Sequence, residues 1–375
     1  MHQPILSQFC CRAPFSKRSG FWPPVCDIIK RVIVLRGKIQ KKRTAKKFDF
    51  FKKNKKLIMI GIAAVVVLIG AVVLFSGPGE EKHVAIDVEY IEKQSANTIK
   101  VYDKSKDAVF EMNMEQYLKG VVAAEMPIRY EPEALKAQAV AARTYTYYKY
   151  NFEKCKRNGA DICTDHTHCQ AYVDHDERKA SYGENYQAFE GKLNNAVGET
   201  FGEVMTYDGE LILAFYHSTS GGRTEDGSSV FKGDYPYLTS VESPGEEGSS
   251  RFEAEKSFSY GQFKQAIAEK YKDVKLKNLK TEVAVSSRTN GGRVNELTVA
   301  NKKIKGTEVR TMFKLDSANF EIKVTGDKVI FKTKGFGHGV GMSQVGANAM
   351  AKENKTYSEI LRHYYSGINI ENVEK

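Results

Sequence analysis

One glutamate occupies a position where the surrounding sequence predicts an apolar residue. Residues 113–127 read NMEQYLKGVVAAEMP, and the aliphatic residues of this segment share one helical face: Leu118, Val121 and Val122. Glu125 takes the next position on that face, close to the end of the predicted helix. Burial and the negative end of the helix dipole both disfavour a carboxylate there and raise its pKa. Such an acid can serve as a general acid near neutral pH. The same spacing also fits a glutamate at the edge of the face, paired with a nearby Lys or Arg.

A second group of chemically active side chains follows about thirty residues later. The segment CKRNGADICTDHTHC places five cysteine and histidine residues, both metal-binding types, within fifteen positions: Cys155, Cys163, His166, His168 and Cys169. Because three cysteines cannot all pair within one chain, this density favours a tetrahedral zinc site. Four protein ligands would leave no open position on the metal, so a structural zinc is favoured over a catalytic one. The alternative is a disulfide between Cys163 and Cys169 with one thiol left over.

Two further segments suggest chemistry that their spacing does not support. His217 and Ser220 lie in FYHSTSGG, which is not the G-x-S-x-G turn of serine hydrolases. Residues 335–344 (GFGHGVGMSQ) are glycine-rich but lack the register of a dinucleotide-binding loop, and too few residues follow to complete that unit. We expect these glycines to permit close backbone approach to a cleft, with His338 and Gln344 as candidate lining residues, although His338 could equally be structural.

Two predicted helices position Glu125. Asn113 with Gln116 three residues later is a capping-box pattern, and Pro127 disfavours continuation beyond Glu125 or Met126. A second helix is expected from Pro132 to about residue 155.

One face of this second helix carries two cations, because Lys136, Val140 and Arg143 follow the i, i+4, i+7 spacing. If this face turns toward Glu125, Lys136 and Arg143 can bind a polar substrate and stabilise the carboxylate once its proton has left. Otherwise they form an ordinary solvated stripe.

The remaining pattern predicts an α+β fold, with mixed β-sheets and helices around a substrate cleft. Strands are expected at 83–102 and 196–217, with further strands between two later helices, at 256–270 and 356–365. Hairpin turns are expected at Asp208-Gly209, at residues 290–292 and at Gly326-Asp327. Strands and helices occur in blocks rather than in strict alternation, which favours α+β over a doubly wound sheet.

The charge of the chain is concentrated at its N-terminus. Residues 1–56 carry sixteen Lys and Arg and two Asp, a net of +14, so the rest of the chain has a net charge of −3. Residues 57–75 form an apolar run of nineteen residues, close to the length that spans a bilayer. The positive-inside rule then predicts a cytoplasmic basic tail (1–56), a transmembrane signal anchor (57–75), a linker (76–84) and an extracytoplasmic domain (85–375). This topology explains the basic tail without nucleic-acid binding. A cleaved signal peptide is the rival interpretation, but its small-x-small site is absent.

Four motifs in order resemble the stage II sporulation protein D (SpoIID/LytB) family. They are AAEMP with EPEALKAQAVAARTYTYY, DHTHCQAY, FYHSTSGG and GFGHGVGMSQVGANAMA, and the resemblance covers roughly residues 85–370. It implies a peptidoglycan lytic transglycosylase of forespore engulfment, which cleaves the β-1,4 bond between N-acetylmuramic acid and N-acetylglucosamine in peptide-stripped strands. The products have 1,6-anhydro-muramoyl ends. The same domain family includes amidase enhancers, so a wall-binding module without catalysis is the alternative.

The resemblance also implies roles for individual residues. Glu125 matches the catalytic glutamate of the E-M-P motif. The implied substrate-binding residues are Lys136, Arg143, Gln170, Tyr216, His217 and Ser220. The implied zinc ligands are Cys163, His168 and Cys169, with Cys155 favoured over His166 as the fourth. Implied partners are the glycan strand, the amidase SpoIIP and the membrane protein SpoIIM, and the implied location is the mother-cell membrane, facing the septum.

Overall fold

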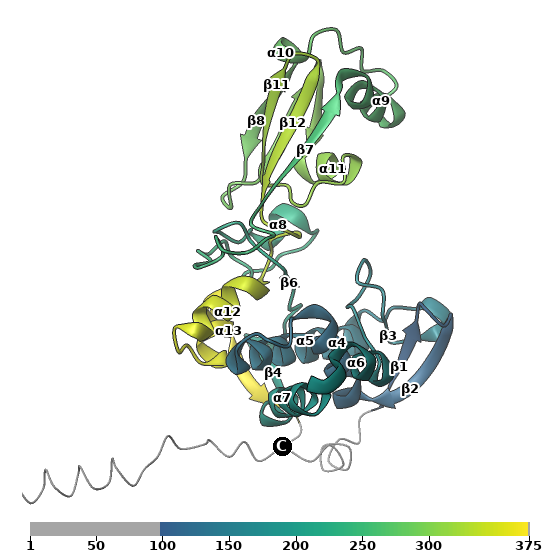
Figure 1. The fold of residues 1–375 in the computed structure, drawn as a ribbon, viewed down its shortest axis with the longest axis vertical. Coiled ribbons are helices and arrows are strands. Elements are labelled where there is room, and N and C mark those ends of the chain that lie inside the picture. The colour runs from purple at the N-terminus through teal and green to yellow at the C-terminus, as the bar shows by residue number, and fades with distance from the viewer. Residues whose placement is uncertain (1–97, 374–375) are drawn as a thin grey trace, which may run out of the picture. The chain divides into compact units, whose positions relative to one another are not determined.

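The computed structural model describes residues 98–373 (Figure 1). The predicted tail (1–56), anchor (57–75) and linker (76–84) lie outside these residues, as does the part of the first predicted strand before Thr98. Within 98–373, no helix combines the length and the apolar character needed to cross a membrane. All described residues belong to one compact unit, His83–Lys375.

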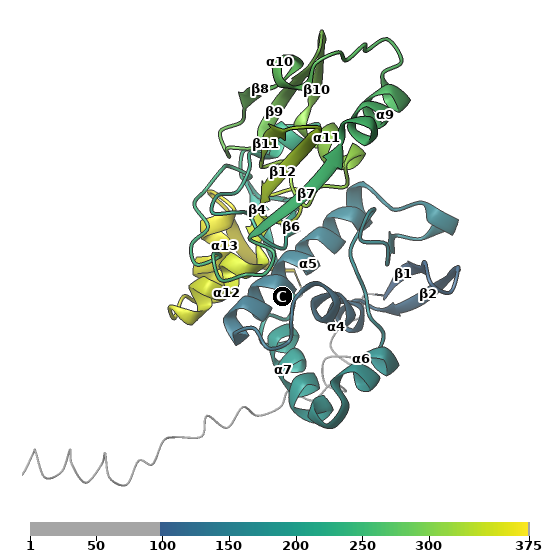
Figure 2. The same ribbon diagram turned by 45° about the horizontal axis from the view of Figure 1, so that its top comes forward.

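The predicted α+β class is confirmed. A first hydrophobic core gathers mainly helices, whose bounds are α4 Met114–Glu125, α5 Pro132–Phe152, α6 His175–Tyr182, α7 Tyr186–Glu199, α12 Gln344–Lys352 and α13 Tyr357–Tyr364. Helices α12 and α13 lie beside α5 although two hundred residues separate them in sequence (Figure 2). The long helix α5 is thereby enclosed on several sides, and the alanines of its sequence permit this close packing.

Three small sheets accompany the first core. The strands are β1 Thr98–Asp103, β2 Ala108–Asn113, β3 Ile162–Cys163, β4 Glu203–Tyr207, β5 Glu210–Leu211, β6 Tyr216–His217, β13 Met342–Ser343 and β14 Asn369–Asn372. Their orders are β2-β1-β3, β14-β4-β5 and β13-β6. The short parallel pair of β6 and β13 joins the FYHSTSGG segment to the glycine-rich segment, with Met342 opposite Tyr216.

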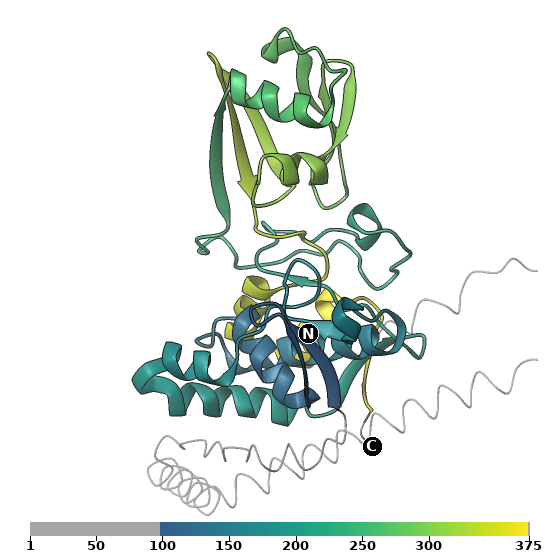
Figure 3. The same cartoon turned by 90° about the vertical axis from the view of Figure 1, so that its right-hand side faces the viewer.

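A second hydrophobic core is built from two antiparallel sheets, β10-β9-β8 and β11-β12-β7. Its elements are β7 Glu253–Ser259, α9 Tyr260–Lys270, α10 Leu279–Glu282, β8 Val283–Arg288, β9 Val294–Val299, β10 Lys302–Lys305, α11 Gly306–Met312, β11 Phe320–Thr325 and β12 Lys328–Lys334. Helix α9 packs on the sheet of β7 and β12 (Figure 3), and stacked rings of Phe263 and Phe313 fill the space beneath it. A short helix, α8 (Gly227–Val230), precedes this region.

The start and end signals around Glu125 are confirmed. The Asn113 side chain accepts hydrogen bonds from the backbone N–H groups of Glu115 and Gln116, and so begins α4 where the sequence predicts. The helix ends at Glu125, with Met126 in an extended conformation before Pro127. Helix α5 begins at Pro132, also as predicted.

The predicted hairpins are confirmed, whereas two element boundaries are wrong. Turns connect β4 to β5 at Asp208-Gly209, β8 to β9 at 290–292, and β11 to β12 at Gly326-Asp327. The strand predicted from residue 196 begins only at 203, because residues 196–199 complete helix α7 and bury Ala196 and Val197 in the first core. The helix predicted from residue 256 begins at 260, because residues 253–259 pair with β12.

Candidate functional site

Glu125 lies at the last position of α4 with a partly exposed side chain. Its Oε1 accepts a hydrogen bond of 2.7 Å from the backbone N–H of Ala171, and its Oε2 lies 3.5 Å from Nε2 of Gln344. Three distant segments therefore meet at this carboxyl group: the end of α4, the loop after the cysteines, and the start of α12. The carboxyl group can reach a ligand from outside while the protein holds it in place.

The surroundings of Glu125 favour its neutral form. Burial raises the pKa of Glu125 above its ordinary value, and this effect outweighs the hydrogen bonds from Ala171 and Gln344, which lower the pKa. A nearby positive charge on His166 would also lower it. The net direction is the one expected from the sequence, and it gives this group the property that a general acid needs.

Gln170 and Tyr216 lie beside Glu125 and are joined to each other. The Tyr216 hydroxyl donates a 2.7 Å hydrogen bond to Oε1 of Gln170, whose Nε2 donates to Thr146 at 3.0 Å. Burial first, and then the charge of Glu125, raise the pKa of Tyr216 well above its ordinary value, so its hydroxyl stays neutral. The Gln170 side chain is fully buried, so Tyr216 is the more accessible of the two.

His217 follows Tyr216, but its ring is buried in a different direction. Its Nδ1 bonds to the backbone carbonyl of Val340 at 3.1 Å, and its Nε2 is buried without a partner. Burial lowers the pKa of His217 to about 3, so the imidazole is neutral. The neighbouring ring of His338 lies 5.6 Å away and its pKa is also lowered, chiefly by burial. Two neutral histidines thus pack together on the far side of β6 from the Tyr216 hydroxyl.

Ser220 bonds to a buried carboxylate rather than to a histidine. Its hydroxyl donates to Oε2 of Glu246 at 2.8 Å, and both residues have no exposed surface. Glu246 also accepts hydrogen bonds from the backbone of Gly221 and Gly222 and from the hydroxyl of Ser243. This arrangement stabilises the loop and supports the sequence argument against a serine hydrolase.

Lys136 is occupied by two carboxylates. Its Nζ lies 2.7 Å from Glu133 and 2.5 Å from Glu199, and it lines a groove of about 410 Å³ between α5 and α7. These contacts belong to the start of α5 and the end of α7. The structure therefore gives Lys136 partners other than Glu125.

Arg143 lies inside the first core with no exposed surface. Its guanidinium makes a bidentate ion pair with Glu115: Nε donates to Oε1 at 2.7 Å, and Nη2 donates to Oε2 at 2.6 Å. It also donates to the backbone carbonyls of Val197 and Glu203. The shared face of Lys136 and Arg143 that the sequence suggests is not turned toward Glu125: Arg143 joins α4, α5 and α7 from within.

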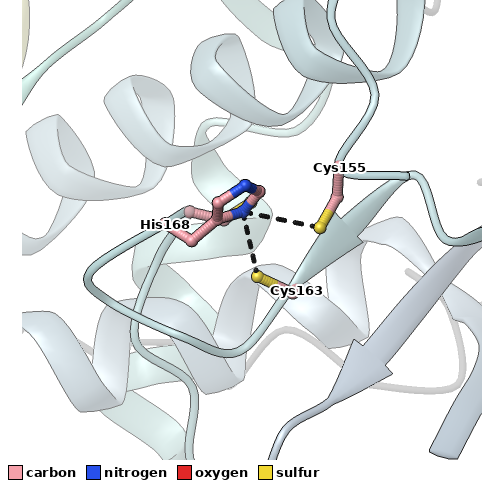
Figure 4. Close-up of side chains that lie close together, drawn as sticks. Cys155, Cys163 and His168 are labelled. Atoms are coloured by element: carbon pink, nitrogen blue, oxygen red, sulfur yellow. Dashed lines mark hydrogen bonds between the residues drawn. The ribbon is translucent and has the colours of Figure 1, made fainter. Parts of the chain in front are cut away.

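The predicted cluster of cysteine and histidine side chains assembles after α5 (Figure 4). Its members are Cys155, Cys163, His168 and Cys169, and their donor atoms all lie within 4.8 Å of one another. Nδ1 of His168 lies 3.5 Å from the sulfurs of Cys155 and Cys163 and 3.3 Å from that of Cys169. The three cysteines are free thiols, so the alternative of a disulfide is not found. The preference for Cys155 over His166 agrees with this group, which is near enough to hold a metal ion.

Asp165 shapes the loop that carries the cluster, a role that the sequence did not indicate. Its carboxylate accepts hydrogen bonds from the backbone and hydroxyl of Thr167, and forms ion pairs with Lys104 and Arg157. The hydrogen bond from Thr167 is the largest cause that holds the pKa of Asp165 well below its usual range. The D-x-T spacing of a local side-chain turn is the signal that could have identified it.

Two glycines of the segment 335–344 permit close approach, as expected. A Cβ on Gly341 would lie 1.9 Å from the carbonyl oxygen of Phe215, and one on Gly339 would lie 2.0 Å from the guanidinium of Arg293. Both glycines also have positive φ, at +70° and +85°. The absent side chain of Gly341 leaves room for the backbone of Phe215, next to the pairing of β6 with β13, and that of Gly339 leaves room for Arg293.

Comparison with known proteins agrees with the motifs. The family model described as "Stage II sporulation protein" matches residues 102–207, and one described as a domain of unknown function matches residues 236–341. The stage II sporulation proteins D of Bacillus amyloliquefaciens and Bacillus subtilis (strain 168) are each 38% identical over 279 residues, which cover 74% of this chain and 80% of the relative. The amidase enhancer of Bacillus subtilis (strain 168) is 29% identical over 304 residues, which cover 68% of this chain and 40% of the relative. On this similarity, the chain belongs to the stage II sporulation protein D family.

Proposed function

We propose that this protein is a peptidoglycan lytic transglycosylase that cleaves peptide-stripped glycan strands during forespore engulfment in sporulation. The observation that carries the proposal is the partly exposed Glu125, whose pKa is raised by burial and whose Oε1 is held by Ala171. The hydrogen bond from Ala171 leaves Oε2 as the oxygen that carries the proton. A neutral carboxylic acid at an accessible position is the group that this reaction requires.

One carboxyl group is enough for the proposed reaction. Glu125 donates its proton to the glycosidic oxygen, and the bond between that oxygen and C1 of the muramoyl sugar breaks. The resulting carboxylate takes the proton of the C6 hydroxyl, and the C6 oxygen bonds to C1 to close the 1,6-anhydro ring. Glycosidases that use water normally need two flanking carboxylates, whereas here the substrate supplies the nucleophile. Among the described residues, the groups that act on Glu125 are the backbone N–H of Ala171, the amide of Gln344 and the ring of His166, and none of them is a carboxylate.

Of the residues expected to bind substrate, Tyr216 is the best placed, because it is partly exposed beside Glu125, whereas the buried Gln170 orients its hydroxyl. The hydroxyl and amide of this bonded pair are neutral, and so suit a neutral sugar. His217, Ser220 and Arg143 are buried with other partners, so in this proposal they support the site rather than contact the glycan.

We propose zinc as the metal of the cysteine and histidine group. A tetrahedral zinc with sulfur at about 2.3 Å and nitrogen at about 2.0–2.1 Å separates these ligands by roughly 3.6 Å, and the distances from His168 to the three sulfurs are 3.3–3.5 Å. The hydrogen bond from Cys169 is the largest cause that lowers the pKa of Cys163, which favours a metal-binding thiolate. With four protein ligands, zinc would hold the loop together and supply no open position for chemistry.

The experiment that tests the proposal is digestion of intact and peptide-stripped peptidoglycan by the full chain, with mass spectrometry of the products. We expect 1,6-anhydro-muramoyl ends from the stripped glycan and none from the Glu125→Gln variant. The second candidate function is an amidase activator without catalysis, which the similarity to the amidase enhancer supports. If wild type and Glu125→Gln stimulate a wall amidase equally and neither releases anhydro products, that second function is correct.

The proposed setting is the mother-cell membrane, with residues 57–75 as the anchor and the domain facing the septal wall. The amidase SpoIIP would remove the stem peptides and so make the substrate, with SpoIIM as a membrane partner. Protease added to intact protoplasts should digest the chain beyond about residue 76 and spare the basic tail. Complete protection of the domain would contradict this topology.

A further inference from the structure

Two buried glutamines, Gln344 and Gln138, form a row of polar contacts that begins at Glu125. Gln344, the first residue of α12, places its Nε2 3.5 Å from Oε2 of Glu125 and 3.3 Å from Oε1 of Gln138. Gln138 lies in the middle of α5 and has no exposed surface. Side chains from α4, α12 and α5 therefore form one chain of polar contacts that leads from the carboxyl group into the core.

The hydrogen bonding of Gln138, at the inner end of these contacts, is incomplete. The Nε2 of Gln138 is buried and has no hydrogen-bond partner among residues 98–373. Such a donor is costly to bury, and an apolar residue of similar size would fill the same space without this cost. The amide of Gln138 therefore has its effect through the oxygen that faces Gln344.

Rotating the side-chain amides of Gln138 and Gln344 by half a turn gives a second arrangement that occupies nearly the same space. Each amide exchanges its oxygen and its nitrogen, which occupy nearly the same space. Gln344 then presents Oε1 to Glu125, and Gln138 donates from Nε2 to that same oxygen. The arrangement described above supplies a donor to an ionised Glu125, whereas the inverted arrangement supplies an acceptor to the proton of the neutral acid. The bond between the two glutamines is kept in both.

We propose that Gln138 and Gln344 are coupled positioning residues, whose amides invert together as Glu125 gains or loses its proton. This inference rests on the proposed function, in which one carboxyl group acts first as acid and then as base. If Gln344 always presented its N–H donor, it would stabilise only the ionised form of Glu125. If it always presented its oxygen, it would stabilise only the protonated form. A pair that inverts gives Oε2 a partner in both steps, without requiring water to enter.

Because one amide atom of Gln138 has no partner, Gln138 and Gln344 should shift the pKa of Glu125 in opposite directions. When Glu125 is ionised, the buried atom of Gln138 that lacks a partner is the N–H donor Nε2. When Glu125 is protonated and the amides are inverted, that atom is the carbonyl oxygen Oε1. Buried N–H groups without a partner are rarer in proteins than buried carbonyl oxygens that lack one, and we take this as the sign of a less favourable arrangement. Gln138 therefore tilts the equilibrium toward the acid, and replacing it with methionine should lower the pKa of Glu125. Replacing Gln344 removes the side-chain donor that faces Oε2 of the ionised carboxylate, so burial disfavours the charge more strongly and the pKa of Glu125 should rise.

The test is an infrared pH titration of the full chain, in which the carbonyl band of protonated Glu125 is identified by its loss in Glu125→Gln. We expect the midpoint to move to higher pH in Gln344→Met and to lower pH in Gln138→Met, with changes of up to roughly tenfold in the protonation equilibrium. His166 and Tyr216, the other titratable groups that act on or sense the charge of Glu125, are unchanged in both variants. The control is Asn194→Leu on α7, which also removes a buried amide, one whose Oδ1 has no partner among the described residues. Asn194 does not take part in the contacts between Glu125, Gln344 and Gln138, so this variant should leave the midpoint unchanged.

Shifts in the same direction, or no shift in either glutamine variant, would overturn the proposal. A second measurement uses the wild type alone, so poor folding of a variant cannot obscure the result. Carbonyl-labelled glutamine identifies side-chain amide bands, and these bands must change together with the protonation of Glu125. Amide bands that stay constant through the titration contradict inversion. Because neither measurement depends on glycan cleavage, failure of the proposed enzyme activity would be seen separately, in the digestion experiment.

Discussion

The backbone N–H of Ala171 donates a 2.7 Å hydrogen bond to Oε1 of Glu125, across 46 positions of sequence. Ala171 comes two residues after Cys169, the last member of the cysteine and histidine group. The loop that would be held by a metal is therefore the loop that holds the proposed catalytic acid. Gln170, between them, is itself fixed by Thr146 and Tyr216.

Loss of the metal should loosen this hydrogen bond. In His168→Ala we expect metal content to fall well below one ion per chain, together with a lower melting temperature. Activity should also fall, because Oε1 of Glu125 loses the donor that orients it. Since the bond from Ala171 lowers the pKa of Glu125, its loss should raise that pKa further. Metal analysis, thermal unfolding and the infrared titration would measure the three effects on one sample.

The chain offers a matched control, because His166 lies two residues from His168 and is exposed, outside the cysteine and histidine group. His166→Ala should retain the metal and the melting temperature of the wild type. Equal metal loss in both variants would show that the ligand set is different.

The Glu125→Gln variant should lose activity while it keeps its fold. The amide retains the size of the side chain and can still accept the hydrogen bond from Ala171, but it has no proton to transfer. General acid–base assistance is typically worth ~10²–10⁴-fold, and one group here performs both steps, so we expect a loss at the upper end or beyond. Release of anhydro-muramoyl products should be compared at equal protein concentration. A rate close to that of the wild type would remove Glu125 from the mechanism.

The same variant should change how stability depends on pH. Because the pKa of Glu125 is raised in the folded protein, the folded state binds this proton more tightly than the unfolded chain does. The stabilising contribution is complete below the pKa of the unfolded chain, about 4.3, and is lost as the pH rises through the folded-state pKa. Glu125→Gln has no such loss. Relative to the wild type, its free energy of unfolding should increase as the pH rises from about 4, which urea unfolding at a series of pH values would measure.

The local signals in the sequence were sufficient for the elements around the site. The Asn113 cap and Pro127 define where α4 begins and ends, and Pro132 defines where α5 begins, because capping and proline effects depend on neighbouring residues alone. The clustering of the cysteine and histidine side chains was also predictable, since four of the five candidates lie within seven residues in sequence. The boundaries that failed, at residues 196–202 and 256–259, depend instead on packing against the core and on pairing with β12.

Most partners of the charged residues could not be read from spacing. Lys136 and Arg143 share a helical face in the sequence, yet one lines a groove and the other is enclosed in the core with Glu115. Glu133 is a neighbour of Lys136 on α5 itself, at the i, i+3 spacing. The other partners, Glu199 on α7 and Glu115 on α4, are set by the packing of these helices against α5. The contact between Gln138 and Gln344 spans 206 positions, so it has no local signal at all.

Arg143 should therefore matter for stability rather than for glycan binding. Arg143→Met would leave the Glu115 carboxylate buried without its partner, and breaking a buried ion pair in this way typically costs about 3–5 kcal/mol. The double variant Arg143→Met with Glu115→Leu removes both charges and should recover a large part of that loss, because a well-packed apolar pair can replace a buried ion pair. Lys136→Met is the control: its ion pairs are partly exposed, so the loss should be about 1 kcal/mol or less. Urea unfolding gives all four free energies, counting the wild type. An Arg143→Met protein of unchanged stability but weakened binding to stripped glycan would instead place Arg143 at the substrate.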